Sequence, residues 1–571
     1  MKLPQRIAVY FLLFAVSSLF APLAAIAAVN ITPVPQELTM GRGTLALSKQ
    51  FNIDTKNLPD SFLCEAHKFA KSVSSATSIQ SAVTATGKGR IKLVYNSAYP
   101  KEGYNLNITP RGAVIRASSK AGFFYAFQTV MHLLPPNIAM GVRDTSIRHV
   151  TLPALTINDQ PRFEYRGFML DVSRHFFDTD EIKRLLRLMA VYKMNRFHWH
   201  LTDDQGWRLE IKQYPRLATI GSKSQNCRMN DMKSGVWWLN DQYGPFYYTQ
   251  EQVTDIVNYA KELHIEVIPE IDMPGHFSAA MAAYPLYSCT PTGQHNVQTY
   301  QGGVWEDVLN VGDSMSVQFA KNILTEVCRL FPSQLIHIGG DECPTKAWEG
   351  NSLCQKLFTS LKLSSYRQLQ SRFIKQMSDH VASMGKQLVV WNESVTAKGA
   401  DLNTIGRTGA MVMSWNPCQQ GALVAAKLKL PVIITEYHTD SGSYYINRRQ
   451  SQDLGEPLGA GNGDDTVERC YSYCPVPASV PDSLKRFYKG IQATFWTEWV
   501  SDNDYLEYLA LPRLMAVAET AWSREDRKDF NSFCQRMAND TTMFKLGGYN
   551  YAPHIFKIRS DAKNCDNNKS R

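Results

Sequence analysis

The 571-residue sequence predicts an α/β fold in which a (β/α)8 (TIM) barrel follows a small α+β accessory domain. Three observations indicate the barrel: eight short apolar runs of strand length, amphipathic helical patterns between most of them, and a total span of roughly 360 residues, which suits a barrel with insertions. The eight runs are 167–172, 196–202, 265–271, 335–338, 387–391, 410–415, 431–436 and 493–499. A doubly wound open sheet is the alternative, but no glycine-rich phosphate loop follows a first strand.

The first 27 residues have the pattern of a signal peptide. Lys2 and Arg6 precede an apolar run from Ile7 to Phe20, and small residues around Ala27 follow the break at Pro22. We expect cleavage after Ala27, export to the periplasm or the extracellular space, and no stable membrane span afterwards. An uncleaved anchor is the alternative, although the run is barely long enough for one.

Export implies an oxidising compartment, in which the 11 cysteines matter. Their odd number leaves at least one outside any intramolecular pairing. Cys470 and Cys474 lie close together in the sequence, as do Cys343 and Cys354, so either pair is a candidate disulfide. Because neither pair has further ligands at metal spacing, disulfides or buried thiols are favoured over a zinc site.

Residues 28–158 predict the accessory domain. Strand-like runs occupy 91–95, 103–109 and 113–117, and a helical pattern with one buried face runs from Ala121 to Leu134. The barrel is expected at 159–525, and residues 526–571 form a C-terminal extension that packs on the barrel or remains a tail.

The barrel helices are predicted between the apolar runs, with the clearest patterns at 179–194, 249–263, 315–330 and 366–384. Long insertions are expected at 221–248 and 438–480, and insertions of this length are usually functional or mobile.

Composition narrows the function. With 44% hydrophobic and 20% charged residues the chain can bury a large core, so it is not disordered. The formal charge of +9 is small for this length and no basic run is present, so we expect no nucleic-acid partner. Tryptophans recur beside carboxylates, a combination that suits sugars.

The carboxyl ends of barrel strands build the active site in this fold, and polar or aromatic residues follow all eight runs. The clearest group is Asp341 and Glu342, which follow an apolar strand and two glycines. Repulsion between the two carboxylates is expected to raise one pKa and to leave an acid that works near neutral pH. A solvated pair at a helix N-terminus is the alternative.

A second group, at 197–204, includes His198, His200, Asp203 and Asp204. Two histidines and two aspartates could bind a divalent cation. Because His198 and His200 alternate along a strand and face the same way, hydrogen-bonded residues of the barrel interior are favoured, and no metal is expected.

Six ordered motifs between about 160 and 525 resemble glycoside hydrolase family 20, the β-N-acetylhexosaminidases. They are RGFMLDVSRH from Arg166, HWHLTDDQGWRLEI from His198, PEIDMPGH from Pro269, HIGGDE from His337, VVWNE from Val389 and FWTEW from Phe495. The N-terminal domain is similar to the accessory domain of that family.

The resemblance implies exo-acting hydrolysis of terminal β-linked N-acetylhexosaminides with retention, through attack by the acetamido oxygen of the substrate. By similarity, Asp341 stabilises the acetamido group and Glu342 is the general acid and base. Asp203 and His276 are similar to a charge chain that runs to Glu342.

Further residues match substrate-binding positions of the family: Arg174 and Glu498 for ring hydroxyls, Trp391, Trp415 and Trp496 as aromatic walls, and Tyr445 with Asn447 for the acetamido oxygen. Trp237 and Trp238 lie in the first insertion, which is expected to shape sites beyond the cleaved bond. No cofactor is implied. A non-catalytic glycan-binding homologue and a chitinase-like endo-acting enzyme are the alternatives, and GlcNAc or GalNAc preference and oligomeric state stay open.

Overall fold

The computed structural model describes residues 29–56, 58–230, 237–299, 303–437, 442–449, 456 and 465–553. The predicted signal peptide, Cys565, the end of the C-terminal extension and parts of both insertions, including the side chain of Trp237, lie outside the described residues.

Eight parallel strands close into a barrel, as predicted. In chain order they are β8 (Tyr165–Asp171), β9 (Arg196–His200), β14 (Glu266–Glu270), β15 (Leu335–His337), β16 (Gln387–Trp391), β17 (Met411–Ser414), β18 (Val432–Ile434) and β19 (Tyr488–Phe495). Asp171 pairs with His200, and Glu270 pairs with both His200 and His337, so the polar residues at four strand ends lie at one level.

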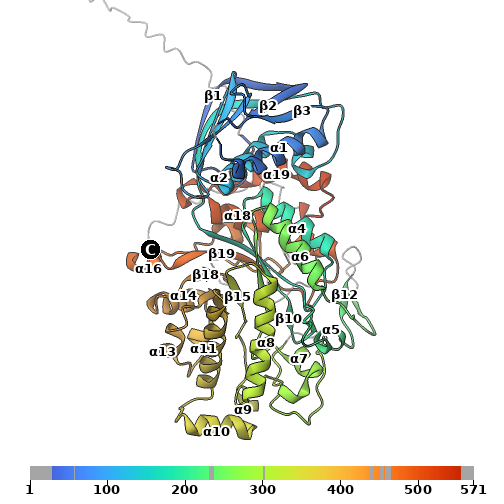
Figure 1. Ribbon diagram of the computed structural model, residues 1–571, viewed down its shortest axis with the longest axis vertical. Helices are drawn as coiled ribbons and strands as arrows, with labels where there is room; N and C mark the ends of the chain where they lie inside the picture. Colours follow the sequence, from blue (N-terminus) through green and yellow to red (C-terminus); the bar gives the residue numbers. More distant parts are fainter. Residues whose placement is uncertain are drawn as a thin grey trace, which may run out of the picture.

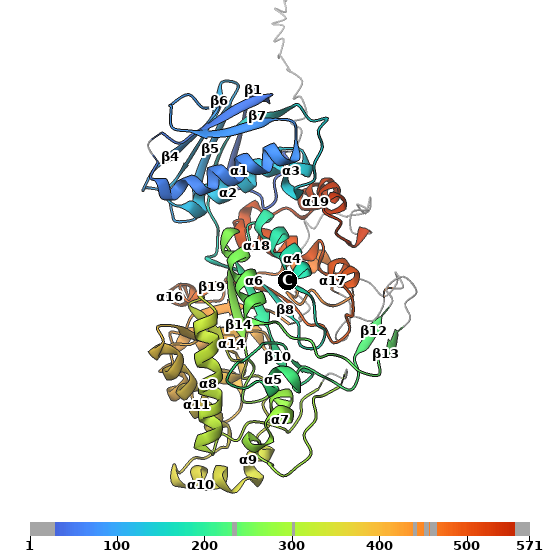
Figure 2. The same ribbon diagram turned by 45° about the vertical axis from the view of Figure 1, so that its right-hand side comes forward.

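Helices surround the barrel (Figures 1 and 2). The four that the sequence indicated most clearly are α4 (Thr179–Val191), α6 (Gln250–Glu262), α8 (Ser314–Leu330) and α11 (Arg367–Ser383). The first three start at side-chain caps, namely Asp178, Asp313 and the capping box of Thr249 and Gln252. The first two end before the predicted limit because the chain turns into a left-handed conformation at Lys193 (φ 62°) and His264 (φ 57°).

The accessory domain is a seven-stranded sheet in the order β1-β7-β5-β6-β4-β2-β3, with helices between the sheet and the barrel (Figures 1 and 2). Its elements are β1 (Glu37–Ser48), β2 (Gln50–Asp54), α1 (Leu63–Ala76), β3 (Gln80–Thr84), β4 (Ile91–Tyr95), β5 (Tyr104–Thr109), β6 (Gly112–Ala117), α2 (Lys120–Leu133), α3 (Pro136–Met140) and β7 (His149–Asp159). The three predicted strands and helix α2 are confirmed. The edge strand β1 gave no apolar signal because most of its side chains are exposed.

The C-terminal extension begins with α19 (Phe530–Leu546), which contacts both domains. Asp540 accepts hydrogen bonds from Asn30 Nδ2 at 2.6 Å, beside the accessory domain, and from the Tyr192 hydroxyl of the barrel at 2.8 Å. The described part of the extension is therefore packed structure that joins the two domains.

The ten cysteines that the structure describes form no disulfide bond. Neither candidate pair is bonded: Cys470 is buried while Cys474 is exposed, and the Cys354 thiol faces Cys289 instead of Cys343. Within the described residues, no helix is both long and apolar enough to cross a membrane.

Candidate active site

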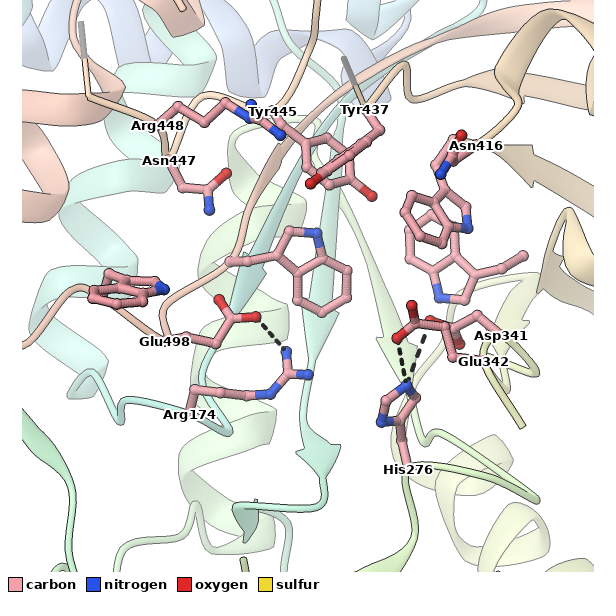
Figure 3. A pocket seen from close by; sticks show the side chains of 14 residues that line it. Arg174, His276, Asp341, Glu342, Asn416, Tyr437, Tyr445, Asn447, Arg448 and Glu498 are labelled. Atoms are coloured by element: carbon pink, nitrogen blue, oxygen red, sulfur yellow. Dashed lines mark ion pairs between the residues drawn. The ribbon is translucent and has the colours of Figure 1, made fainter. Parts of the chain in front are cut away.

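A cavity of about 330 Å³ opens among the loops that follow the barrel strands (Figure 3). Ten of the eleven predicted site residues line it: Arg174, His276, Asp341, Glu342, Trp391, Trp415, Tyr445, Asn447, Trp496 and Glu498. The eleventh, Asp203, is buried behind Arg174 and His276. The structure thus brings every predicted residue to one place.

The backbone after β15 places Asp341 and Glu342 at the cavity. Gly339 (φ 63°) and Gly340 (φ 87°) are left-handed, and so is Glu342 (φ 42°). A Cβ on Gly339 would lie 1.8 Å from Oδ1 of Asp272, so only glycine fits there. The Asp341 side chain is 9% exposed, whereas the Glu342 side chain is 43% exposed.

His276 lies between the two carboxylates and a second acidic pair. Its Nε2 atom is 3.3 Å from Oε2 of Glu342 and 4.0 Å from Oδ2 of Asp341 (Figure 3). Its Nδ1 atom is 2.8 Å from Oδ2 of Asp204 and 3.3 Å from Oδ1 of Asp203. Burial disfavours the imidazolium, but these carboxylates outweigh it and raise the pKa of His276 well above its ordinary value.

Asp341 is a weaker acid here than an ordinary aspartate. Burial raises the pKa of Asp341 to about 6, His276 opposes the shift, and the charges of Glu270 and Glu342 add to it. Burial thus contributes more than the repulsion between neighbours that the sequence suggested. At neutral pH the Asp341 carboxyl is ionised.

Arg174 is held rigidly across the cavity from His276 (Figure 3). Its guanidinium donates to Oδ2 of Asp171 at 3.1 Å and to Oε1 of Gln205 at 2.8 Å, and pairs with Oδ2 of Asp203 at 2.8 Å. A longer contact of 3.7 Å reaches Glu498. Three carboxylates around one planar cation fix its orientation before any ligand arrives.

Three indole rings form the walls, and two of them donate hydrogen bonds to carboxylates. Trp391 Nε1 donates to Glu270 at 2.8 Å, and Trp415 Nε1 donates to Glu393 at 2.9 Å. The Trp496 ring lies under the Arg174 guanidinium, 5.1 Å from it.

Three oxygens of residues that line the cavity are buried without a hydrogen-bond partner in the described part of the chain: Oδ1 of Asp341, Oδ1 of Asn447 and Oε2 of Glu498. Because buried polar atoms are nearly always paired, these oxygens indicate a polar ligand.

The sequence profile "Glycosyl hydrolase family 20, catalytic domain" matches residues 163–525, and "Glycosyl hydrolase family 20, domain 2" matches residues 28–160. The first match spans more than half of the chain. The chain belongs to glycosyl hydrolase family 20.

Relatives and solved structures agree with the family 20 assignment. The chain is 38% identical over 527 residues to a beta-hexosaminidase of Porphyromonas gingivalis, covering 92% of this chain and 64% of the relative. It therefore spans less than two thirds of that relative. A beta-hexosaminidase of Akkermansia muciniphila is 30% identical, with coverages of 82% and 88%.

A crystal structure of Streptomyces plicatus N-acetyl-beta-hexosaminidase in complex with Thio-NAglucal superimposes with a TM-score of 0.76 at 30% identity, covering 92% of this chain and 96% of that one. The Vibrio harveyi exo beta-N-acetylglucosaminidase in complex with N-acetylglucosamine gives 0.78 at 28% identity, with coverages of 92% and 78%.

Behind the cavity of this family 20 barrel, Glu270 joins three histidines. Its carboxylate lies 3.0 Å from Nε2 of His198 and 2.9 Å from Nδ1 of His337, and it also contacts His200. The ligand atoms of His198, Glu270 and His337 lie close enough together to hold one metal ion. The histidines line the barrel interior in contact with carboxylates, and they lower the pKa of Glu270 well below its ordinary value although burial opposes this.

Sequence reasoning placed Asp203 next to His276 but left Asp204 out of the charge chain, although Asp204 makes the shorter contact. It also assigned no role to four residues that line the cavity: Asn416, Tyr437, Arg448 and Trp499. Asn416 and Trp499 adjoin predicted residues at strand ends, so adjacency was the available signal. Arg448 lies against the Tyr437 ring at 4.6 Å through a loop conformation that no strand pattern reveals.

Proposed function

We propose that this chain is an exported, exo-acting β-N-acetylhexosaminidase that releases terminal β-linked GlcNAc or GalNAc with retention, by substrate-assisted catalysis. One observation carries the proposal: a buried Asp341 and an exposed Glu342, neighbours in the chain, both contact one histidine at the edge of a cavity walled by indole rings. Beta-hexosaminidase relatives and the family 20 profile support the same reaction class.

In the proposed first step, the acetamido oxygen of the substrate attacks the anomeric carbon and the glycosidic C–O bond breaks. Glu342 gives its proton to the leaving oxygen, and an oxazolinium ion forms. Asp341, ionised at neutral pH, accepts from the acetamido N–H and stabilises its positive charge. In the second step Glu342 takes a proton from water, whose oxygen bonds to the anomeric carbon as the oxazolinium ring opens.

His276 supports both steps as a positioning residue. Because Asp203 and Asp204 stabilise its cation, the imidazolium faces Glu342 and favours the carboxylate that remains after proton transfer. Arg174 and Glu498, on the far side of the cavity, are placed to bind ring hydroxyls (Figure 3). A cavity of about 330 Å³ lies at the small end of ligand sites, in keeping with a single terminal sugar.

The test compares 4-nitrophenyl N-acetyl-β-glucosaminide with the plain 4-nitrophenyl β-glucoside, which lacks the acetamido nucleophile. We expect fast hydrolysis of the first and little of the second. Equal rates would contradict acetamido participation, and binding of N-acetylglucosamine without hydrolysis of either would identify a glycan-binding homologue. N-terminal sequencing of the secreted protein tests export, and a start at Ala28 is expected.

A further inference from the structure

Two buried cysteines meet between neighbouring loops of the barrel. Cys289 follows α7 (Ser278–Ala283) on the connection after β14, and Cys354 lies in α10 (Ser352–Ser360) on the connection after β15. Cys289 is 7% exposed and Cys354 is 0% exposed. The two thiols are hydrogen-bonded to each other.

The surrounding hydrogen bonds fix this meeting from both sides. Asn351 Nδ2 donates to the Cys289 carbonyl at 2.9 Å, and Asn351 Oδ1 accepts from the Cys354 amide at 3.1 Å. The Cys354 thiol lies 3.3 Å from Oδ1 of Asn310, and the Cys289 thiol lies 3.9 Å from the carbonyl of the preceding Leu309. One amide side chain thus joins the two cysteine backbones, while the two sulfurs contact consecutive residues of one segment.

We propose that Cys289 and Cys354 form a structural disulfide when the protein folds in an oxidising compartment. One S–S bond forms, and two protons and two electrons leave the thiols. The oxidant is a disulfide, carried by a protein or by glutathione, and it is reduced to two thiols. The two sulfurs are already close enough to share a hydrogen bond.

The hydrogen bond between the two thiols makes their acidities unequal. The hydrogen bond from Cys289 and the backbone N–H of Gly312 lower the pKa of Cys354, although burial opposes them. Donation of that same hydrogen bond, with burial, raises the pKa of Cys289.

The disulfide would join the two loops that hold the catalytic contact. Cys289 follows His276 by 13 residues and Cys354 follows Glu342 by 12. Hydrogen bonds also connect these loops between the cysteines and the catalytic residues. Trp348 Nε1 donates to the Leu309 carbonyl at 3.0 Å, and the Leu309 amide donates to the Pro274 carbonyl at 3.0 Å. A covalent bond here would restrain the distance between His276 and Glu342.

The test is a disulfide map of the full chain produced through a bacterial periplasm. The protein is denatured, its free thiols are alkylated with iodoacetamide, and its peptides are analysed by mass spectrometry without reduction. We expect a linked peptide pair that contains Cys289 and Cys354. Complete alkylation of both residues, or linkage of either one to another cysteine, would overturn the proposal.

Thermal unfolding gives the second readout. Closing a loop of about 65 residues restricts the unfolded chain, so dithiothreitol should lower the Tm of the wild type by roughly 5 °C. Cys289→Ser should remove this response, while the matched control Cys474→Ser, at an exposed thiol, should keep it. An unchanged wild-type Tm on reduction would refute a structural role. Both readouts are independent of glycosidase activity, and the map needs no variant to fold.

Discussion

Lowering the pH from 7 to 5 is expected to reduce kcat/KM about tenfold, because Asp341 becomes protonated. Burial, opposed by His276, raises the pKa of this carboxyl to about 6. A single group with that pKa is about nine-tenths ionised at pH 7 and about one-tenth ionised at pH 5. Neutral Asp341 cannot stabilise the positive charge that develops on the acetamido group, so only the ionised fraction is active. The value of kcat/KM should therefore decrease as the pH falls through 6.

The assay is kcat/KM for 4-nitrophenyl N-acetyl-β-glucosaminide between pH 4 and 9, because kcat/KM reports the groups of the free enzyme. An activated leaving group needs little help from a general acid, so the general-acid step contributes little to this profile. The acid limb then belongs to Asp341.

Asp341→Asn supplies the control, since the amide does not titrate. Its residual activity should be low and should show no limb near pH 6. The reasoning is refuted if the wild-type rate stays level down to about pH 4.5, or if the same limb persists in Asp341→Asn.

Glu342→Gln should lower kcat on N,N′-diacetylchitobiose about 100- to 10,000-fold and affect the activated aryl glycoside far less; equal losses on both would argue against proton donation. Gly339→Ala should lower the Tm by several degrees or prevent folding, because the new Cβ would lie 1.8 Å from Oδ1 of Asp272, whereas Gly350→Ala, with nothing within 4 Å of its Cβ, should leave the Tm unchanged. Burial raises the pKa of Glu393 to about 8, so between about pH 5 and 8 the unfolded chain ionises this carboxyl while the folded chain keeps it protonated. Wild-type stability therefore falls over this range, and Glu393→Gln should gain Tm relative to the wild type as the pH rises; a constant difference would disprove the shift.

The barrel could be predicted because its strands are buried on both sides, as β8 is along its whole length, and are therefore mostly apolar in sequence. Its helices could be predicted from one apolar face, but their ends depended on left-handed residues such as Lys193, which leave little trace in the pattern. The accessory domain was only partly predictable. Its edge strand β1 is largely exposed, so its sequence resembles a loop.

The site residues could be predicted where a charged side chain directly follows a barrel strand in the sequence. Arg174, Asp341 and Glu498 are of this kind, since a barrel brings all carboxyl ends to one rim. Contacts between loops could not be predicted in this way. Cys343 and Cys354 are 11 positions apart, yet Cys354 meets Cys289, 65 positions away, because the connections after β14 and β15 lie side by side.

The division of labour between adjacent acids depends on the backbone. Neighbouring residues of an extended strand point to opposite faces, which would send one carboxylate into the barrel wall. The left-handed conformation of Glu342 (φ 42°) turns its side chain to the rim above Asp341, and His276 (φ 46°) is left-handed at the point where it meets both. Such conformations cost roughly 1–3 kcal/mol each at residues other than glycine, so the contacts of the site must compensate for them. The 3.3 Å contact between His276 and Glu342 links the two left-handed residues, and Asp203 and Asp204 hold the other side of the imidazole. Removal of the His276 partners should therefore disturb Glu342 as much as removal of His276 itself.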